Sequence, residues 1–174
     1  MPYRAPILTL IAACVAFAEP AGAQAVSLTG ADGAVRTLEA PAIAALPRVS
    51  VPLTIHGEAH LFEGPLLIDV LKATGVETGQ ALRGSALAQA VVVRAADGYA
   101  VVFGLAELDP ATRPNRIILA DAVDGAPLTA GDGPFRLVAE GDLRPARSVR
   151  QVTAIEVMRV PAGQTAPSAP EAHH

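Results

Sequence analysis

The sequence contains very little cysteine, few aromatic residues and few charges. Its single cysteine is Cys14, tryptophan is absent, and aromatic residues make up 3% of the 174 residues. Cys14 lies in an N-terminal segment that we expect to be removed. The mature chain would then have no disulfide, no thiolate nucleophile and no thiolate metal ligand. Charged residues make up only 17%, and the net charge of −4 includes no basic block. We therefore predict no nucleic-acid partner and no anionic membrane partner.

Small apolar residues are abundant instead. Hydrophobic residues make up 51% of the sequence, which is enough to bury a core and argues against global disorder. Much of this content is alanine and valine, so we expect a tightly packed core of small side chains. The length fits one domain better than two.

Residues 1–25 have the features of a secretory signal peptide. Arg4 provides the positive charge that such signals carry near the start of the chain. The run "APILTLIAACVAFA" is apolar, and "AGAQA" offers small residues for cleavage after Ala23 or Ala25. We therefore predict a periplasmic or secreted protein whose folded domain covers residues 26–160.

Two other interpretations of the apolar run are less favoured. A transmembrane helix needs about 20 apolar residues, and Glu19 and Pro20 interrupt the run too early. We therefore expect no transmembrane segment after signal removal. The sequence "IAAC", ending at Cys14, is similar to a bacterial lipoprotein cleavage box. Because the apolar run continues past Cys14, export without lipidation is favoured.

Short β-prone runs around Asp-Gly turns predict hairpins. One hairpin is expected around Asp32-Gly33, and a second, "VVVRAADGYAVVF", around Asp97-Gly98. The run "VSVPLTIHG" is typical of a strand, and Pro52 indicates a bulge or an edge position in it. Three further strands are expected in "NRIILADAV", "GPFRLVAEG" and "VTAIEVMRV", with an Asp-Gly turn at 124–125 between the first two.

Helical signals are short. The run "APAIAALPRV" predicts a single helical turn, and "LAEL" begins another. The strongest signal places Pro65 at the first position of a helix, continues with apolar residues at helical spacing, and ends at Gly75. Many short strands with few short helices predict an α+β fold of mixed β-sheets. Residues 161–174 have nothing to bury and are expected to form a disordered tail.

The two internal histidines are the first candidates for a metal site. In an extended strand, His56 and His60 would lie about 13 Å apart, which is too far to share one ion. A tight turn at Gly57 would bring them together. Zinc sites usually need three or four ligands, so we predict no metal site here.

The sequence also gives little support for hydrolase chemistry. No G-x-S-x-G motif is present, since "RGSAL" around Ser85 lacks the second glycine. Three of the aspartates, at 97, 124 and 132, adjoin glycine, where turn formation explains them. We therefore assign no catalytic residue from the sequence.

The stretch "GDLRPARSVRQVTAIEV" carries an arginine at every third position. A helical turn beginning at Pro145 would place Arg147 and Arg150 on nearly the same face. Two guanidinium groups beside free N–H groups form a workable anion site. The alternative is that these arginines pair with acids near them in sequence, at positions 140, 142 and 156. From these residues alone the alternative is favoured, because charged side chains mostly stay at the surface.

Three segments in order resemble the molybdopterin-binding domain of the sulfite oxidase family. "HLFEGPLLIDVLKATGV" is similar to its F-x-G-x-P-L-x-D-L-L-x-x-x-G segment, and "ADGYAVVFGLAEL" to the x-D-G-Y-x-x-x-F-x-L-x-E-L segment of its small bacterial members. The stretch "LADAVDGAPLTAGDGPFRLVAEGDLRPARSVRQVTAIEV" is similar to the family's last part, DG-x-P-L, GP-x-R-L and R-x-V-(K/R). The resemblance covers most of residues 49–158.

The resemblance implies an α+β fold and an exported oxidoreductase relative that holds a molybdenum pterin. Arg147 and Arg150 match basic residues that contact the anionic cofactor in the family. The family's enzymes ligate molybdenum through a cysteine at the end of a strand. Ile55 occupies that position here and His56 follows it. A soft thiolate ligand cannot be replaced by isoleucine, and histidine belongs to another ligand class.

Two functional hypotheses follow. In the first, the exported domain still binds a molybdopterin or a related anion, with Arg147 and Arg150 on the phosphate and His56 near the metal position. Sulfite-oxidase-type catalysis is not expected in that case. In the second, the domain binds no cofactor and serves as a periplasmic binding or accessory module that contacts a protein partner.

Overall fold

The computed structural model describes residues 24–161. Its strands are β1 (Ala25–Thr29), β2 (Val35–Glu39), β3 (Arg48–Ile55), β4 (Glu58–Pro65), β5 (Gln89–Ala95), β6 (Ala100–Gly104), β7 (Ile117–Ala120), β8 (Ala122–Val123), β9 (Ala126–Pro127), β10 (Arg136–Ala139) and β11 (Val152–Arg159). Its helices are α1 (Ala40–Ala44) and α2 (Leu67–Leu71), with 3₁₀ turns η1 (Lys72–Thr74), η2 (Gly79–Ala81), η3 (Gly84–Ala88), η4 (Leu105–Leu108) and η5 (Pro145–Arg147).

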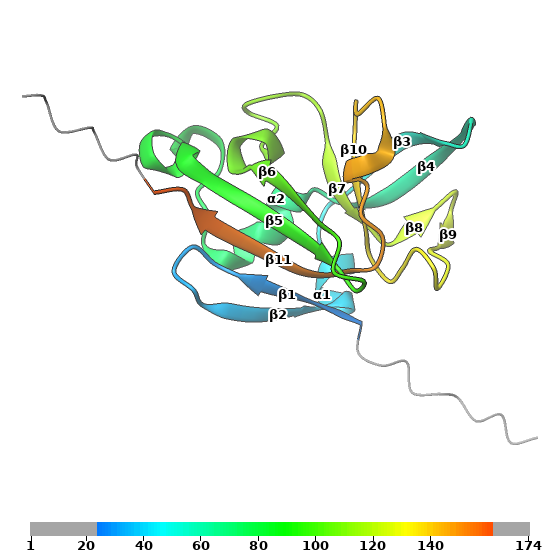
Figure 1. Cartoon of the computed structure of the whole chain (residues 1–174), viewed down its shortest axis with the longest axis horizontal. Coiled ribbons are helices and arrows are strands. Elements are labelled where there is room, and N and C mark those ends of the chain that lie inside the picture. Colours follow the sequence, from blue (N-terminus) through cyan, green and yellow to red (C-terminus); the bar gives the residue numbers. More distant parts are fainter. Residues whose placement is uncertain (1–23, 162–174) are drawn as a thin grey trace, which may run out of the picture.

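The strands form three sheets, which Figure 1 shows side by side along the molecule. The largest has the order β2-β1-β11-β5-β6, the second β3-β4-β8-β9, and β10 pairs with β7. Among the strands between residues 24 and 161, only the β1–β11 pair is parallel, and the other pairs are antiparallel. The first and last strands of the described chain are therefore neighbours.

The predicted hairpins are present. β1 pairs with β2 across the turn at Gly33, and β5 pairs with β6 across the turn at Gly98. Both glycines have a positive φ, which glycine adopts without a steric penalty. Along β5 the residues facing the core are apolar, with Val91 and Val93 fully buried. Local turn chemistry and alternation were sufficient to predict these elements.

The helix expected to begin at Pro65 begins later. Pro65 is the last residue of β4, and α2 starts at Leu67. Residues 58–65 pair along their whole length with β3, and this long-range pairing holds Pro65 in extended backbone. The helix ends in η1, and Gly75 follows in the left-handed conformation as predicted. The register also leaves β3 at the edge of its sheet, in agreement with Pro52.

The Asp-Gly turn at 124–125 also connects different strands from those expected. It joins β8 and β9, a small hairpin that extends the sheet beyond β4. β7 and β10 still pair with each other, at the register Arg136↔Ala120. The β8–β9 hairpin and the β3–β4 hairpin thus lie together at one end of the molecule (Figure 1).

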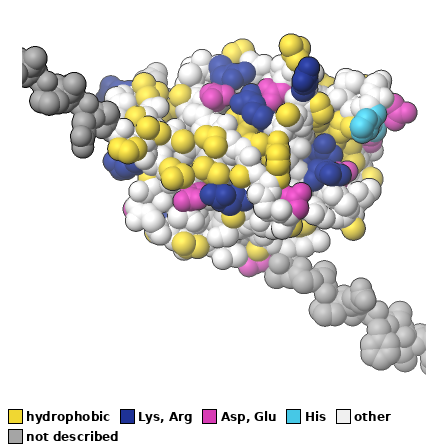
Figure 2. All heavy atoms as spheres, viewed as in Figure 1, with side chains coloured by type: hydrophobic (Ala, Val, Ile, Leu, Met, Phe, Trp, Pro, Cys, Tyr) yellow, Lys and Arg dark blue, Asp and Glu magenta, His cyan; other side chains and the backbone are white. Residues whose placement is uncertain are grey.

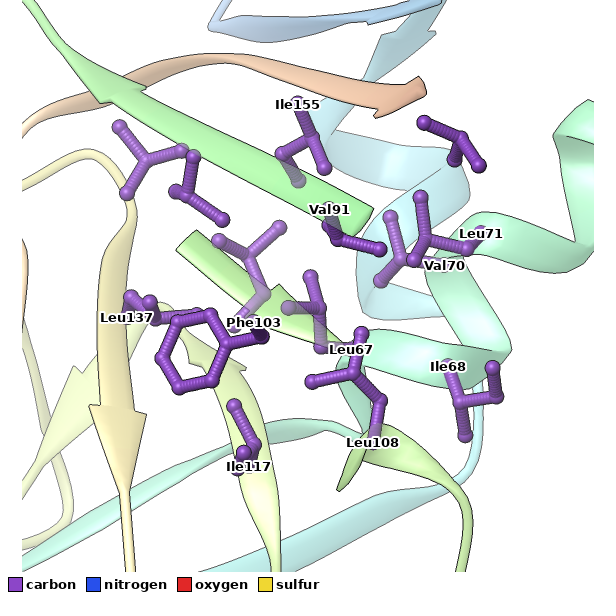
Figure 3. Packing of buried hydrophobic residues seen from close by; sticks show 14 of the residues in the cluster. Leu67, Ile68, Val70, Leu71, Val91, Phe103, Leu108, Ile117, Leu137 and Ile155 are labelled. Carbon is purple, nitrogen blue, oxygen red and sulfur yellow. The ribbon is translucent and has the colours of Figure 1, made fainter. Parts of the chain in front are cut away.

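The main core lies between the five-stranded sheet, α2 and the β7–β10 pair. Figure 3 shows Phe103, Leu67, Leu137 and Ile117 converging from four elements. Gly64 permits a close backbone approach, because a Cβ atom there would overlap the Leu119 carbonyl oxygen and would lie 2.7 Å from the Cα of Ala120. The glycine of the F-x-G segment therefore lets β4 cross against β7.

The structure confirms the predicted α+β class of mixed sheets with a few short helices. The prediction of a signal peptide over residues 1–25 and of a disordered tail over residues 161–174 falls almost wholly outside the described residues. Between residues 24 and 161, no helix is long and apolar enough to cross a membrane.

Candidate functional site

A cavity of about 610 Å³ lies between the β3–β4 hairpin, the β8–β9 hairpin, β10 and the loop around η5. We call it the hairpin cavity. Its lining includes Ile55, His56, His60, Asp132, Arg136 and Arg150. Figure 2 shows exposed histidine (cyan), acidic (magenta) and basic (dark blue) side chains at this end of the molecule. The volume is within the range of pockets that bind small molecules, about 300–1,000 Å³.

Arg136 is the buried cation of the hairpin cavity. It belongs to β10, and only 8% of its side chain is exposed. Its guanidinium donates to Asp132 Oδ1 at 2.8 Å and to Ser148 Oγ at 3.2 Å, and it lies 5.0 Å over the Phe62 ring. Burial lowers the pKa of Arg136, and the like charge of Arg150 lowers it further. The two guanidinium groups approach the same atom, Asp132 Oδ1, at 2.8 Å from Arg136 and 4.0 Å from Arg150.

The sequence analysis did not identify Arg136 as a site residue. It occupies an ordinary strand position in "GPFRLVAEG", between the buried Phe135 and Leu137. Two signals were available: Arg136 is the arginine of the GP-x-R-L pattern, and it is a charge inside an apolar strand with an acid four residues earlier at Asp132. Charges this deeply buried are rarely found without a partner.

Arg150 is the exposed cation of the hairpin cavity. Its side chain is 66% exposed, and its nearest acidic atom is Asp132 Oδ1 at 4.0 Å. Asp132 is already hydrogen-bonded to Arg136 at 2.8 Å. One carboxylate is therefore shared by two guanidinium groups, and Asp124 supplies the other carboxylate of the cavity lining. An anion with several oxygen atoms would accept hydrogen bonds from the exposed Arg150 guanidinium.

Arg147 does not share the cavity with Arg150. It lies at the end of η5, where it donates to Asp142 at 2.7 and 2.9 Å and to Glu107 at 3.4 Å. These partners raise its pKa, the Asp142 hydrogen bonds most strongly. The predicted common face is absent because η5 is a single 3₁₀ turn that stops at Arg147. The alternative of pairing with a nearby acid thus describes Arg147 correctly.

The two histidines are brought to one cavity by the turn at Gly57. His60 Nδ1 is hydrogen-bonded to Asp124 Oδ2 at 2.8 Å, which links the two hairpins. The Leu61 amide also donates to Asp124, at 2.8 Å. The His60 hydrogen bond, followed by the Leu61 amide, lowers the pKa of Asp124. His56 occupies the turn itself. Within residues 24–161, no three histidine, cysteine or acidic side chains are grouped to hold a metal ion.

Backbone strain is concentrated around this site. Among the described residues, three non-glycine residues have a positive φ: His56 at 52°, Asp124 at 51° and Gln151 at 49°. His56 and Asp124 line the hairpin cavity, and Gln151 directly follows Arg150. Non-glycine residues keep such a conformation only where the surrounding structure holds them in it. They are found more often at functional sites than elsewhere.

A second cavity of about 350 Å³ lies on the other side of η5. We call it the Tyr99 cavity. It shares Pro145, Ser148 and Arg150 with the hairpin cavity, and it is also lined by Asp97 and Tyr99. The Tyr99 hydroxyl donates to the Ala146 carbonyl at 2.8 Å, which ties the β5–β6 turn to the η5 loop. The "DGY" segment thereby supports the loop that carries Arg150.

Comparison with known proteins gives a structural neighbour but no sequence relative. No protein-family model matches the sequence, and no curated protein is significantly similar to it. The fold is similar to the crystal structure of the sulfane dehydrogenase SoxCD from Paracoccus pantotrophus, with a TM-score of 0.57 and 14% identity. The match covers 78% of this chain and 38% of that chain. At this identity the similarity shows a related fold alone.

Proposed function

We propose that this chain is an exported domain that binds a phosphate-bearing anion of the molybdopterin class in the hairpin cavity, without sulfite-oxidase-type catalysis. One observation carries the proposal: Ile55 and Arg150, far apart in sequence, line the same cavity. In the family that the sequence resembles, these positions correspond to the metal-ligating residue and to a cofactor-binding basic residue. A cavity that joins them is what a pterin site on this fold requires.

The basic part of the cavity suits a phosphate group. The Arg150 guanidinium is accessible, and the Arg136 guanidinium lies beneath it with a fixed orientation. Guanidinium groups bind phosphate through paired N–H donors. His56 and His60 line the same cavity and add ring nitrogen atoms, of which His60 Nδ1 is already hydrogen-bonded to Asp124. These four side chains would hold and orient the anion.

The metal end of the cavity does not suit molybdenum ligated by a thiolate. Ile55 is the last residue of β3, where the resemblance places the cysteine, and its side chain has no ligand atom. The neighbouring His56 offers an imidazole, which is a different class of ligand. We therefore assign no redox step and no catalytic residue to this site.

A second function is favoured by the same Ile55. An isoleucine at the ligand position is expected in a domain that retained the fold and lost the cofactor. Such a domain would serve as an accessory module that contacts another exported protein. The two functions differ in whether the purified domain contains a pterin.

Cofactor content is the experiment that separates them. The full chain would be expressed with its own N-terminal segment in a host that makes molybdenum cofactor, and the exported protein purified. Pterin would be measured by fluorescence after oxidation, and molybdenum by mass spectrometry. We expect pterin in near-stoichiometric amount in the wild type and its loss in Arg150→Ala. Wild-type protein without pterin would refute the proposal and favour the accessory module.

Arg144→Ala is the matched control. Arg144 is an exposed arginine of the same loop, and it lines neither cavity. Its replacement changes the net charge by the same amount as Arg150→Ala. Equal pterin loss in both variants would indicate a general charge effect and contradict a specific role for Arg150.

A further inference from the structure

The two cavities meet at Arg150. The hairpin cavity and the Tyr99 cavity share Pro145, Ser148 and Arg150, so η5 separates them and Arg150 is accessible from both. A phosphate held by Arg150 would therefore have the hairpin cavity on one side and the Tyr99 cavity on the other. The Tyr99 cavity, of about 350 Å³, is at the lower end of the small-molecule range of about 300–1,000 Å³.

The chemistry of the Tyr99 cavity differs from that of the hairpin cavity. Half of the Tyr99 surface (51%) is exposed, although its hydroxyl is fixed to the Ala146 carbonyl. A ring held in place while its surface is open provides a stacking surface for a planar group. Asp97 lies beside it. One of its oxygens accepts the Tyr99 amide at 2.9 Å, and its second oxygen is a potential acceptor for amino groups.

We propose that the Tyr99 cavity binds an amino-bearing aromatic heterocycle, such as a purine, that is joined to the phosphate held by Arg150. The ring stacks on Tyr99, its amino group faces Asp97, and its phosphate lies at Arg150. The ligand class is then a nucleotide-like phosphate rather than a free oxyanion. The inference rests on the proposed function, because it uses the same Arg150 phosphate position.

Adenosine monophosphate is a suitable probe, with inorganic phosphate and adenosine as comparison ligands. The protein would be produced in a host that makes no molybdenum cofactor. Of the two tyrosines, Tyr3 lies in the expected signal peptide, and the sequence has no tryptophan. Tyr99 is thus the only tyrosine from residue 24 onward, and its fluorescence reports directly on ring stacking.

We expect adenosine monophosphate to quench Tyr99 fluorescence and to bind about tenfold more tightly than inorganic phosphate, as stacking on an aromatic side chain would give. Inorganic phosphate should bind without quenching. Calorimetry would measure both affinities. Tyr99→Ala should bind adenosine monophosphate no more tightly than inorganic phosphate, while its affinity for inorganic phosphate stays unchanged. Tyr99→Phe, which keeps the ring and loses the hydrogen bond that fixes it, should retain part of this difference in affinity.

The results also separate this inference from the proposed function. Phosphate binding that depends on Arg150, with equal affinity for the nucleotide and no quenching, would overturn the inference and leave the phosphate site intact. A chain that binds neither probe, and also lacks pterin when made in the cofactor-producing host, would overturn both. If Tyr99→Ala unfolds the domain, the Tyr99→Phe variant and the wild-type quenching still decide the question.

Discussion

The guanidinium of Arg147 lies 4.5 Å from the centre of the Phe103 ring. Phe103 is a core residue of β6, and only 1% of it is exposed. Arg147 thus covers the edge of the main core while its N–H groups donate to Asp142 and Glu107. This arginine connects the η5 loop to the β6–η4 region. Its contacts are those of a structural cation.

Replacing Arg147 should therefore affect stability. Arg147→Met should lower the free energy of unfolding by about 1–2 kcal/mol, because it removes a cation–π contact and a paired hydrogen bond at a partly buried site. Arg150→Met is the matched comparison and should change stability by less than about 0.5 kcal/mol, since Arg150 is mostly exposed. Urea unfolding measures both. Equal stability of the two variants would contradict these assignments.

Gly64 should tolerate no side chain. A Cβ atom at this position would overlap β7 backbone, lying 2.7 Å from Ala120 Cα. Because backbone cannot move aside as a flexible side chain can, Gly64→Ala should lower the free energy of unfolding by about 3 kcal/mol. Gly131→Ala is the control, because the nearest atom to its Cβ would be 4.0 Å away. Thermal unfolding that shifts equally in both variants would show that β4 and β7 are not tightly packed.

The elements that were predicted correctly depend on neighbouring residues. The hairpins at Gly33 and Gly98 follow from turn chemistry and alternation over a few residues. β4 was missed because its evidence lies in β3, with which it pairs along eight positions from Arg48↔Pro65 to Ile55↔Glu58. A proline that suits the start of a helix suits extended backbone equally.

The candidate site was also predictable only in part, because some of its residues are brought together by contacts between distant parts of the sequence. Arg150 and His56 were identified from local patterns and from the resemblance, and the structure places both in the hairpin cavity. Arg136 was missed because its role depends on Arg150 and on the loop at Ser148, which are brought together by the fold. Arg147 was placed beside Arg150 by helical spacing. A single 3₁₀ turn does not maintain that spacing far enough.

Glu140 predicts a specific dependence of stability on pH. Its carboxylate accepts hydrogen bonds from the Arg116 guanidinium, at 2.5 and 2.8 Å, and from the Arg116 amide at 2.8 Å. The guanidinium hydrogen bonds are the main cause that lowers the pKa of Glu140 below its ordinary value of 4.5. A lowered pKa in the folded state stabilises the fold above pH 4.5, and this contribution is lost as pH falls through the folded value.

Glu140→Gln should therefore be less stable than the wild type by about 1 kcal/mol at neutral pH. The difference should narrow below pH 4.5, where the wild-type carboxyl also becomes neutral. Urea unfolding across this pH range measures the effect. In a chain that already carries Arg116→Met, adding Glu140→Gln should change the free energy of unfolding by the same amount at every pH. If the difference in free energy of unfolding between wild type and Glu140→Gln stays constant with pH, the Glu140–Arg116 pair contributes through packing rather than through charge.

His56 offers a test that separates folding from binding. His56 and Gly57 both have a positive φ, 52° and 88°, as the two central residues of a type I′ hairpin turn require. Asparagine adopts this conformation more readily than most residues. His56→Asn should therefore leave the free energy of unfolding unchanged or raise it by a few tenths of a kcal/mol. His56→Val, which is β-branched, should lower it by about 1–2 kcal/mol.

The imidazole nevertheless lies in the wall of the hairpin cavity, which Arg136 and Arg150 also line. If it contacts the bound anion, His56→Asn should weaken phosphate binding severalfold while the fold stays intact, in keeping with the loss of one hydrogen bond to a charged group. Calorimetric titration with inorganic phosphate, run beside thermal unfolding of the same sample, measures both quantities. If folded His56→Asn protein binds phosphate with the wild-type affinity, His56 does not contact the bound anion. Weaker binding without loss of stability would mean that a strained turn holds this histidine for the ligand, since the turn itself folds equally well with asparagine.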